Sequence, residues 1–193
     1  MTHVRSPRLS TFSSSGLWIF GYGSLMWDPG FFHTDVQKAE VAGWHRRMSM
    51  VSTKSYGWAG RPGLAAGLHP GGTVAGLAFF VPQTHVPEVL AVLAGREWAY
   101  RCQFVTARLA NGERVKALTY VSQYLTPHFR PVQPVPELMK RLAHGVGRRG
   151  STWDYVARSA ASLSAHGVRR SDLHTLVTHL PRARSRKRAY GPR

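Results

Sequence analysis

The sequence predicts an α+β fold in which a sheet comes first along the chain and helices follow. Short apolar or alternating runs, which are typical of strands, occupy the first two thirds of the chain, and an Asn-Gly turn joins two of them. Apolar residues at helical spacing, preceded by capping signals, occupy the last third. With 193 residues, of which 43% are hydrophobic, the chain is long enough for one domain with its own core. We expect a single domain at residues 17–181, between a flexible tail at 1–16 and a basic tail at 182–193.

The predicted strands begin with the apolar run at residues 17–20, which leads into a glycine-rich loop at 21–24. Alternating apolar and polar residues predict a half-buried strand at 47–50. A stretch punctuated by glycines at 57–72 precedes a further apolar strand at 74–81.

A β-hairpin is predicted where Asn111-Gly112 separates the alternating segments 104–109 and 115–121. Asn-Gly favours the positive φ angles of a tight two-residue turn. The middle of the chain is therefore expected to form a sheet.

Helices are predicted in the last third of the chain. One begins at Pro136, and another begins at Ser151, with Asp154 in position for a capping box. Gly167 is expected to end that second helix, and apolar spacing predicts a last helix over residues 171–180.

The chain is strongly basic, with 26 Lys and Arg against nine Asp and Glu and a formal charge of +17. A charge of +9 remains when the two tails are left out. Such a surface attracts nucleic acid, anionic membranes or anionic small molecules, and a solvated arginine-rich surface explains it equally well. The chain has no RNP-type signature, zinc-finger spacing or recognition helix, so nucleic acid binding through the basic tails is kept only as a minor alternative.

Several other classes of protein and site are not expected. No stretch approaches the ~20 apolar residues of a membrane span, so no membrane insertion is predicted. Cys102 is the only cysteine and cannot form an internal disulfide, which favours a cytoplasmic location and a packing role for this residue. The ten histidines lack metal-site spacing, so no metal is expected.

Glu97 stands out among the nine carboxylates. If the helix that starts near Pro87 continues past Gly95, Glu97 lies on one apolar stripe with Val86, Leu90 and Leu93. Burial there would raise the pKa of its carboxyl toward the range useful for a general base. An ion pair with Arg101 would instead lower the pKa and give Glu97 a structural role, and the spacing alone does not decide between the two.

The loop that follows the first strand is the second candidate site. It consists of Gly21, Tyr22, Gly23, Ser24 and Leu25. Its glycines let backbone N–H groups turn toward an anion such as a carboxylate or phosphate, although a purely structural turn is also possible. It is not a dinucleotide fingerprint, because Met26 replaces the third glycine and a turn at 28–30 follows where a helix is needed.

Together with their neighbours, these two elements resemble the ChaC family of γ-glutamylcyclotransferases, in its glutathione-specific branch. The resemblance covers about residues 18–180. The matching segments are WIFGYGSLMWDPGF at 18–31, AGWHRRMSM at 42–50, GRPGLAAGLHPGG at 60–72, the strand at 76–80, Arg96-Glu97, and WDYV at 153–156.

The resemblance implies a compact, mixed barrel-like sheet flanked by helices, with the loop and Glu97 lining one cavity. It implies that the γ-glutamyl α-amine attacks its own γ-carbonyl, releasing 5-oxoproline and, from glutathione, Cys-Gly, without a cofactor. The family's acid/base maps to Glu97, and its substrate-binding loop maps to residues 21–25. Tyr120, in the second hairpin strand, is a candidate to supply a hydroxyl to the cavity, although packing is the commoner role of such a tyrosine.

One departure from the family pattern concerns residues 97–101, which form a shorter segment than usual between the Arg-Glu pair and the following Tyr-Arg. This leaves two alternatives open. One is a cyclotransferase for other γ-glutamyl amines or dipeptides, and the other is a catalytically inactive, basic nucleic-acid- or anion-binding protein on the same fold.

Overall fold

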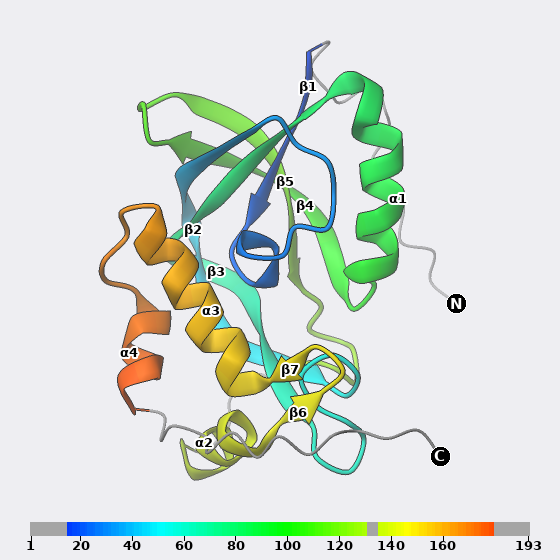
Figure 1. Ribbon diagram of the computed structural model, residues 1–193, viewed down its shortest axis with the longest axis vertical. Coiled ribbons are helices and arrows are strands. Elements are labelled where there is room, and N and C mark those ends of the chain that lie inside the picture. Colours follow the sequence, from blue (N-terminus) through cyan, green and yellow to red (C-terminus); the bar gives the residue numbers. More distant parts are fainter. Residues whose placement is uncertain (1–14, 131–134, 180–193) are drawn as a thin grey trace.

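A closed five-stranded barrel forms the centre of the computed structural model, which describes residues 15–130 and 135–179 (Figure 1). Its strands are β1 (Gly16–Gly21), β2 (Asp35–Ser52), β3 (Gly63–Pro82), β4 (Tyr100–Leu109) and β5 (Arg114–Ser122). Their order around the barrel is β1-β3-β2-β4-β5, and β5 closes it by pairing in parallel with β1. The other neighbouring strands pair antiparallel, so the mixed barrel-like sheet implied by the resemblance is confirmed.

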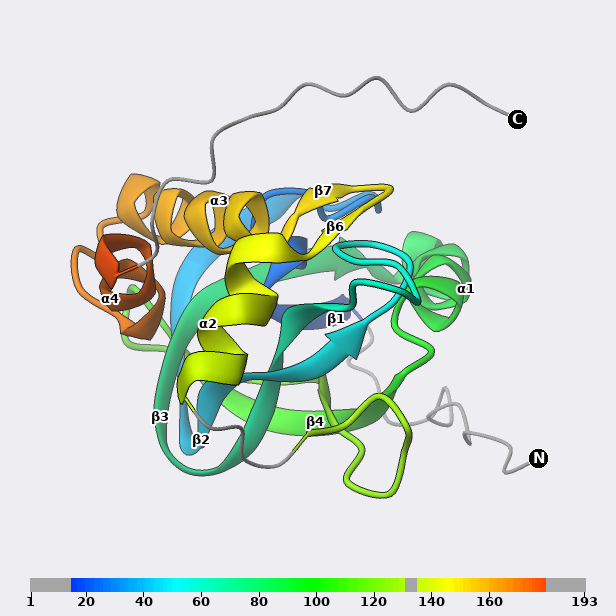
Figure 2. The same ribbon diagram turned by 90° about the horizontal axis from the view of Figure 1, so that it is seen from below.

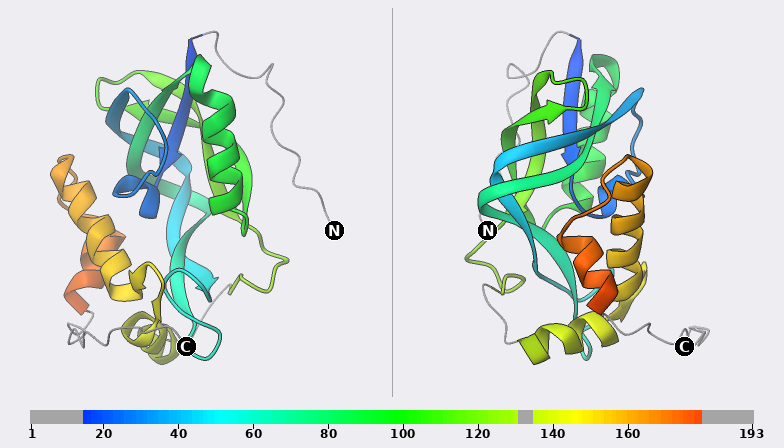
Figure 3. Two further views of the ribbon diagram at one scale, coloured as in Figure 1. Left: turned by 45° about the vertical axis from the view of Figure 1, so that its right-hand side comes forward. Right: turned by 90° about the vertical axis from the view of Figure 1, so that its left-hand side faces the viewer.

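Helices cover the barrel from two sides. They are α1 (Val86–Arg96), α2 (Val135–His144), α3 (Thr152–Ala165) and α4 (Asp172–His179), with short 3₁₀ turns η2 (Ser24–Met26) and η3 (Gln83–His85). A small hairpin of β6 (Val146–Gly147) and β7 (Gly150–Ser151) connects α2 to α3. Helix α1 lies on one side of the barrel and α3 with α4 on the other (Figures 1 and 3), whereas α2 and the small hairpin lie near the start of α3 (Figure 2). Within the described residues, no helix has the length and apolar character needed to cross a membrane.

Two hydrophobic clusters explain why the first strand is apolar on both faces. Phe20 of β1 points into the main cluster, which also contains residues of α3. Leu17 and Ile19 of the same strand point into a second cluster, beneath Val86 and Leu93 of α1. Because both faces of β1 are covered, its sequence is a continuous apolar run rather than an alternating one.

Most of the predicted elements are confirmed. The hairpin joins β4 to β5, and Gly112 in its turn has φ of +89°. Ser151 and Asp154 form the predicted capping box, with each side chain accepting a hydrogen bond from the other residue's backbone N–H. Helix α1 continues through Gly95 to Arg96, as the argument about Glu97 requires.

Two predictions about the long strands need correction. The glycine-punctuated stretch at 57–72 belongs largely to β3, and its Gly67 serves close packing, since a Cβ there would lie 2.0 Å from Ser122 Oγ. The alternation expected at 47–50 is interrupted by a bulge in β2, so that Ser49 and Met50 are both buried. The predicted basic tail, and the C-terminal end expected for the last helix at Leu180, lie outside the described residues.

Candidate active site

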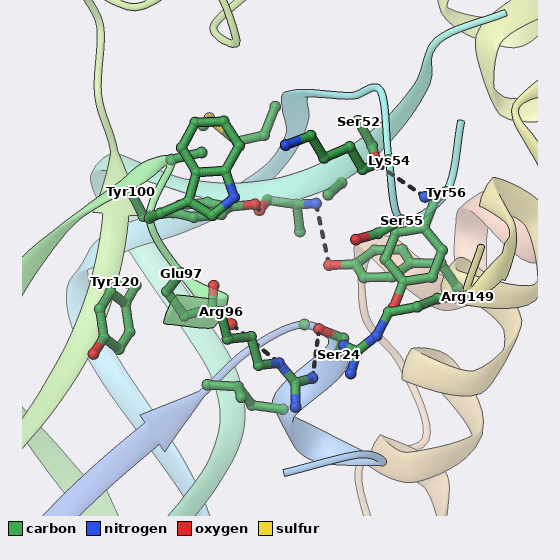
Figure 4. Close-up of a pocket in the computed structure, with 18 of the residues that line it drawn as sticks. Ser24, Ser52, Lys54, Ser55, Tyr56, Arg96, Glu97, Tyr100, Tyr120 and Arg149 are labelled. Atoms are coloured by element: carbon green, nitrogen blue, oxygen red, sulfur yellow. Dashed lines mark hydrogen bonds and ion pairs between the residues drawn. The ribbon is translucent and has the colours of Figure 1, made fainter. Parts of the chain in front are cut away.

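A cavity of about 590 Å³ lies where several segments of the chain meet (Figure 4). They include the loop after β1, the end of β2 and its connection to β3, the end of α1 with the start of β4, and the turn between β6 and β7, and β5 and α3 each contribute a tyrosine. Its volume is in the range of small-molecule sites. The cavity therefore gathers residues that are far apart in the sequence.

Glu97 is held in this cavity by the turn that follows α1. Its backbone N–H donates to the carbonyl of Leu93 (2.8 Å), and its carbonyl accepts from the N–H of Tyr100 (2.9 Å). The short segment at 97–101 is therefore a tight turn at residues 97–99 followed directly by the first two residues of β4. The Glu97 side chain is only 13% exposed and lines the cavity, as its place after the apolar stripe predicts.

The protein environment makes the Glu97 carboxyl a weak acid. Burial raises its pKa to about 7, against the opposing effect of the Arg96 and Arg149 guanidinium groups. The nearest cation is Arg96, whose Nε lies 3.4 Å from Glu97 Oε1. The ion pair with Arg101 that was weighed from the sequence is not formed, since the Arg101 guanidinium donates to Gln103 (2.7 Å). Near neutral pH, Glu97 can therefore both accept and donate a proton.

Arg96 connects Glu97 to the loop after β1. Its Nη1 donates to the carbonyl of Pro29 (3.0 Å), and its Nη2 donates to Ser24 Oγ (3.2 Å) and lies 3.8 Å from Asp28 Oδ2. Its Nε is buried and makes no hydrogen bond within the part of the chain that is described. The guanidinium therefore fixes the loop against the end of α1, and this Nε lies next to the Glu97 carboxyl.

The loop itself is anchored on both sides. The Tyr22 hydroxyl donates to the carbonyl of Tyr120 (2.6 Å), and the carbonyl of Tyr22 accepts from Arg46 Nε (2.7 Å). Gly23 passes so close to α3 that a Cβ there would lie 2.4 Å from the hydroxyl of Tyr155. Only glycine fits at this position.

Four of the five predicted loop residues line the cavity, and Gly21 does not. A Cβ on Gly21 would lie 2.9 Å from Leu25 Cβ, so this glycine permits the close packing of the loop. Among the described residues, no acceptor is found for the backbone N–H groups of Gly23, Ser24 and Leu25. Backbone donors without partners beside a cavity are suited to binding an anion.

The family follows from comparison of the whole chain with known proteins. A family model described as "ChaC-like protein" matches residues 17–182. The chain belongs to the ChaC-like family. The sequence resemblance, drawn from the loop, the Arg-Glu pair and their neighbours, is thereby confirmed.

Curated relatives of this ChaC-like protein share about a quarter to a third of its residues. "Glutathione-specific gamma-glutamylcyclotransferase" of Escherichia coli K12 is 28% identical over 164 residues, covering 83% of this chain and 71% of the relative. "Glutathione-specific gamma-glutamylcyclotransferase 1" of Homo sapiens is 31% identical over 166 residues, covering 82% and 74%. A crystal structure of a yeast gamma-glutamyl cyclotransferase specific to glutathione superimposes with a TM-score of 0.79 at 22% identity, covering 89% of this chain and 98% of that one, which supports the same fold.

Tyr120 of the ChaC-like chain lines the cavity with its ring. Its hydroxyl points away from Glu97 (Figure 4), and burial raises its pKa above the ordinary value. Its backbone carbonyl holds Tyr22, as described above. A direct role of the Tyr120 hydroxyl remains a prediction from the sequence.

Two polar residues that the sequence reasoning missed complete one corner of the cavity. Tyr56 is buried, and its hydroxyl has no hydrogen-bond partner among the described residues. Figure 4 shows this side chain beside Ser24 and Arg149. Arg149 lies in the turn between β6 and β7, and its backbone N–H donates to the carbonyl of Ser55 (2.8 Å). Its side-chain Nη2 lies 3.3 Å from Asp28 Oδ2. Both residues lie in irregular segments, where the sequence has no periodic pattern that predicts a site. Their place at the cavity becomes visible only when these segments are packed against the barrel.

Proposed function

We propose that this protein is a γ-glutamylcyclotransferase that converts glutathione to 5-oxoproline and Cys-Gly. Membership of the ChaC-like family and the names of its curated relatives support the reaction and the substrate. The observation that carries the proposal is a buried carboxyl, Glu97, with a pKa of about 7, in one cavity with a loop whose backbone donors have no partner among the described residues. A cytoplasmic location is part of the proposal, and the single Cys102, which has no partner for an internal disulfide, supports it.

The reaction needs a base because the α-amine of the substrate has a pKa near 8 and is mostly protonated at neutral pH. In the proposed mechanism, the Glu97 carboxylate removes a proton from this ammonium group. The freed nitrogen then attacks the γ-carbonyl carbon and forms the new C–N bond of a five-membered ring. As the tetrahedral intermediate collapses, the original γ-amide C–N bond breaks and Glu97 returns the proton to the leaving amine of Cys-Gly. The ring nitrogen releases its second proton to solvent, which leaves the neutral lactam of 5-oxoproline.

Substrate orientation is the second part of the proposal. The N–H groups at residues 23–25, the Tyr56 hydroxyl and the Arg149 guanidinium are proposed to bind the α-carboxylate of the γ-glutamyl group. With that end fixed, the γ-glutamyl chain folds back so that amine and carbonyl meet beside Glu97. Ring closure is intramolecular, so holding this conformation supplies much of the rate enhancement.

Incubation of the purified protein with glutathione tests the reaction, with 5-oxoproline measured by mass spectrometry. Replacement of Glu97 by Gln keeps the size of the side chain and removes the base, so turnover should fall by about 10² to 10⁴-fold. Glu88→Gln is the matched control, because Glu88 lies in the first turn of α1 and its side chain is 77% exposed. Near-normal 5-oxoproline release by the Glu97→Gln variant would contradict the mechanism.

A further inference from the structure

The cavity carries more positive charge than its own carboxyl groups balance. The charged side chains that line it, among the described residues, are Lys54, Arg96, Glu97, Arg148 and Arg149. Arg96 lies close to Glu97 and Asp28, and Arg149 lies close to Asp28. Lys54 and Arg148, in contrast, have no carboxylate within ion-pair distance in the described parts of the chain, and of the two Lys54 is the one that lies over Trp98, next to Glu97. A positive group without a carboxylate beside it at a substrate cavity is suited to a negative group of the substrate.

Lys54 is held at the side of the cavity that the leaving group would occupy. Its Nζ lies 5.5 Å from the centroid of the Trp98 ring, and Trp98 directly follows Glu97. Its backbone carbonyl accepts a hydrogen bond from the N–H of Arg148 (3.0 Å), so the turn between β6 and β7 fixes its main chain. Figure 4 shows Lys54 at one side of the cavity, and Ser24 with Arg149 at the other.

We propose that Lys54 binds the C-terminal carboxylate of the leaving dipeptide and thereby selects γ-glutamyl peptides over neutral γ-glutamyl amines. The inference rests on the proposed function, which puts the α-carboxylate beside Ser24 and Arg149 and the scissile bond beside Glu97. The remaining part of glutathione then extends toward Lys54. Two extended residues span about 7 Å, which lets the glycine carboxylate reach a cation beyond Trp98.

A pair of substrates and a pair of variants test the role of Lys54. The substrates are glutathione and its glycyl ethyl ester, in which the distal carboxylate is masked. Lys54→Met should lower kcat/KM for glutathione by about fivefold, mainly through a higher KM, because an exposed ion pair contributes up to about 1 kcal/mol. The same substitution should leave kcat/KM for the ester nearly unchanged.

Lys116→Met is the matched control. Lys116 also lies over an aromatic ring, with Nζ 4.6 Å from the Phe104 centroid, but it does not line the cavity. The kcat/KM of this variant should equal that of the unaltered protein for both substrates. An equal loss on both substrates with Lys54→Met, or no loss on either, would overturn the proposal.

Binding measurements separate this inference from the proposed function. In the Glu97→Gln background, glutathione is expected to bind without being cyclised, and calorimetry gives its Kd directly. Adding Lys54→Met should weaken glutathione binding by about fivefold and leave ester binding unchanged. If the unaltered protein released no 5-oxoproline but this difference in Kd persisted, the reaction would be wrong and the role of Lys54 would stand. Equal Kd values with and without Lys54 would refute the role whatever the catalytic result.

Discussion

Two arginines hold the loop after β1 from opposite sides, and their environments differ sharply. All three guanidinium nitrogens of Arg46, in β2, have partners. Two donate to the carbonyls of Tyr22 and Ala75, and Nη1 lies 2.6 Å from Asp172 Oδ1. Its side chain is 1% exposed. Arg96, on the cavity side, has a buried Nε with no hydrogen-bond partner in the part of the chain that the structure describes.

The difference indicates that the Arg46 contacts have a structural role and that the groups near Arg96 are available to a ligand. Each nitrogen of the Arg46 guanidinium donates to an acceptor among the described residues, so this group is satisfied within the protein. On the Arg96 side, a donor of the guanidinium, the N–H groups at 23–25 and the Tyr56 hydroxyl have no partner among the described residues. Unsatisfied polar groups destabilise a fold unless a ligand binds them, which is typical of active sites. The contacts of Arg46 thus anchor the loop, and the donors near Arg96 leave it able to bind a substrate.

Replacing Arg46 by Met should give the largest loss of stability. The substitution leaves the carbonyls of Tyr22 and Ala75 without their donor and separates Asp172 of α4 from the barrel. We expect the free energy of unfolding to fall by about 2 to 4 kcal/mol, as read from urea denaturation.

Arg108→Met is the control for this comparison. Arg108 also pairs with a carboxylate, Glu40, but its side chain is 61% exposed, so its loss should cost less than about 1 kcal/mol. Similar urea midpoints for the two variants would show that the Arg46 contacts do not anchor the loop.

The sequence predicts one side of this comparison better than the other. The loop and Glu97 were identified because each lies in a local pattern, a strand followed by glycines and an apolar helical stripe followed by a carboxylate. Arg46 and Asp172 are 126 positions apart, and an acid in the first turn of a helix is explained by the helix dipole alone. No periodicity links them, so only the fold reveals their contact.

The same reasoning explains which site residues were missed. The hairpin and the capping box depend on neighbouring residues, which is why they were confirmed. Tyr56 and Arg149 lie in connections whose paths are set by the packing of α2, α3 and the barrel. The sequence does not decide between the two roles of Glu97, because it indicates that a carboxylate faces the core but not which arginine accompanies it.

The Glu97→Gln variant should also be more stable than the unaltered protein above neutral pH. The folded-state pKa of Glu97 is raised from 4.5 to about 7. Between these values the folded protein keeps a proton that the unfolded chain releases, so stability is lost as the pH rises through about 7. The loss is on the order of 3 kcal/mol for a shift of this size, and Gln at this position avoids it.

Urea unfolding of both proteins at pH 5 and pH 8 measures this effect. The stability difference in favour of Glu97→Gln should be small at pH 5 and larger at pH 8. A difference that stayed constant between the two pH values would show that the Glu97 carboxyl is not destabilised by its burial.

The smallest expected effect concerns the two cations that act on Glu97. Each guanidinium favours the carboxylate and so lowers its pKa, and Arg96 has the larger effect because it is closer. Replacing Arg149 by Gln should move the acidic limb of the kcat/KM profile to higher pH by less than about one pH unit. Arg96→Gln should move it further in the same direction.

Arg148→Gln is the control for position, because Arg148 lines the same cavity but exerts no resolved effect on the Glu97 pKa. A limb that moved to lower pH with Arg149→Gln, or one that moved equally with Arg148→Gln, would mean that the base titrated in catalysis is not Glu97.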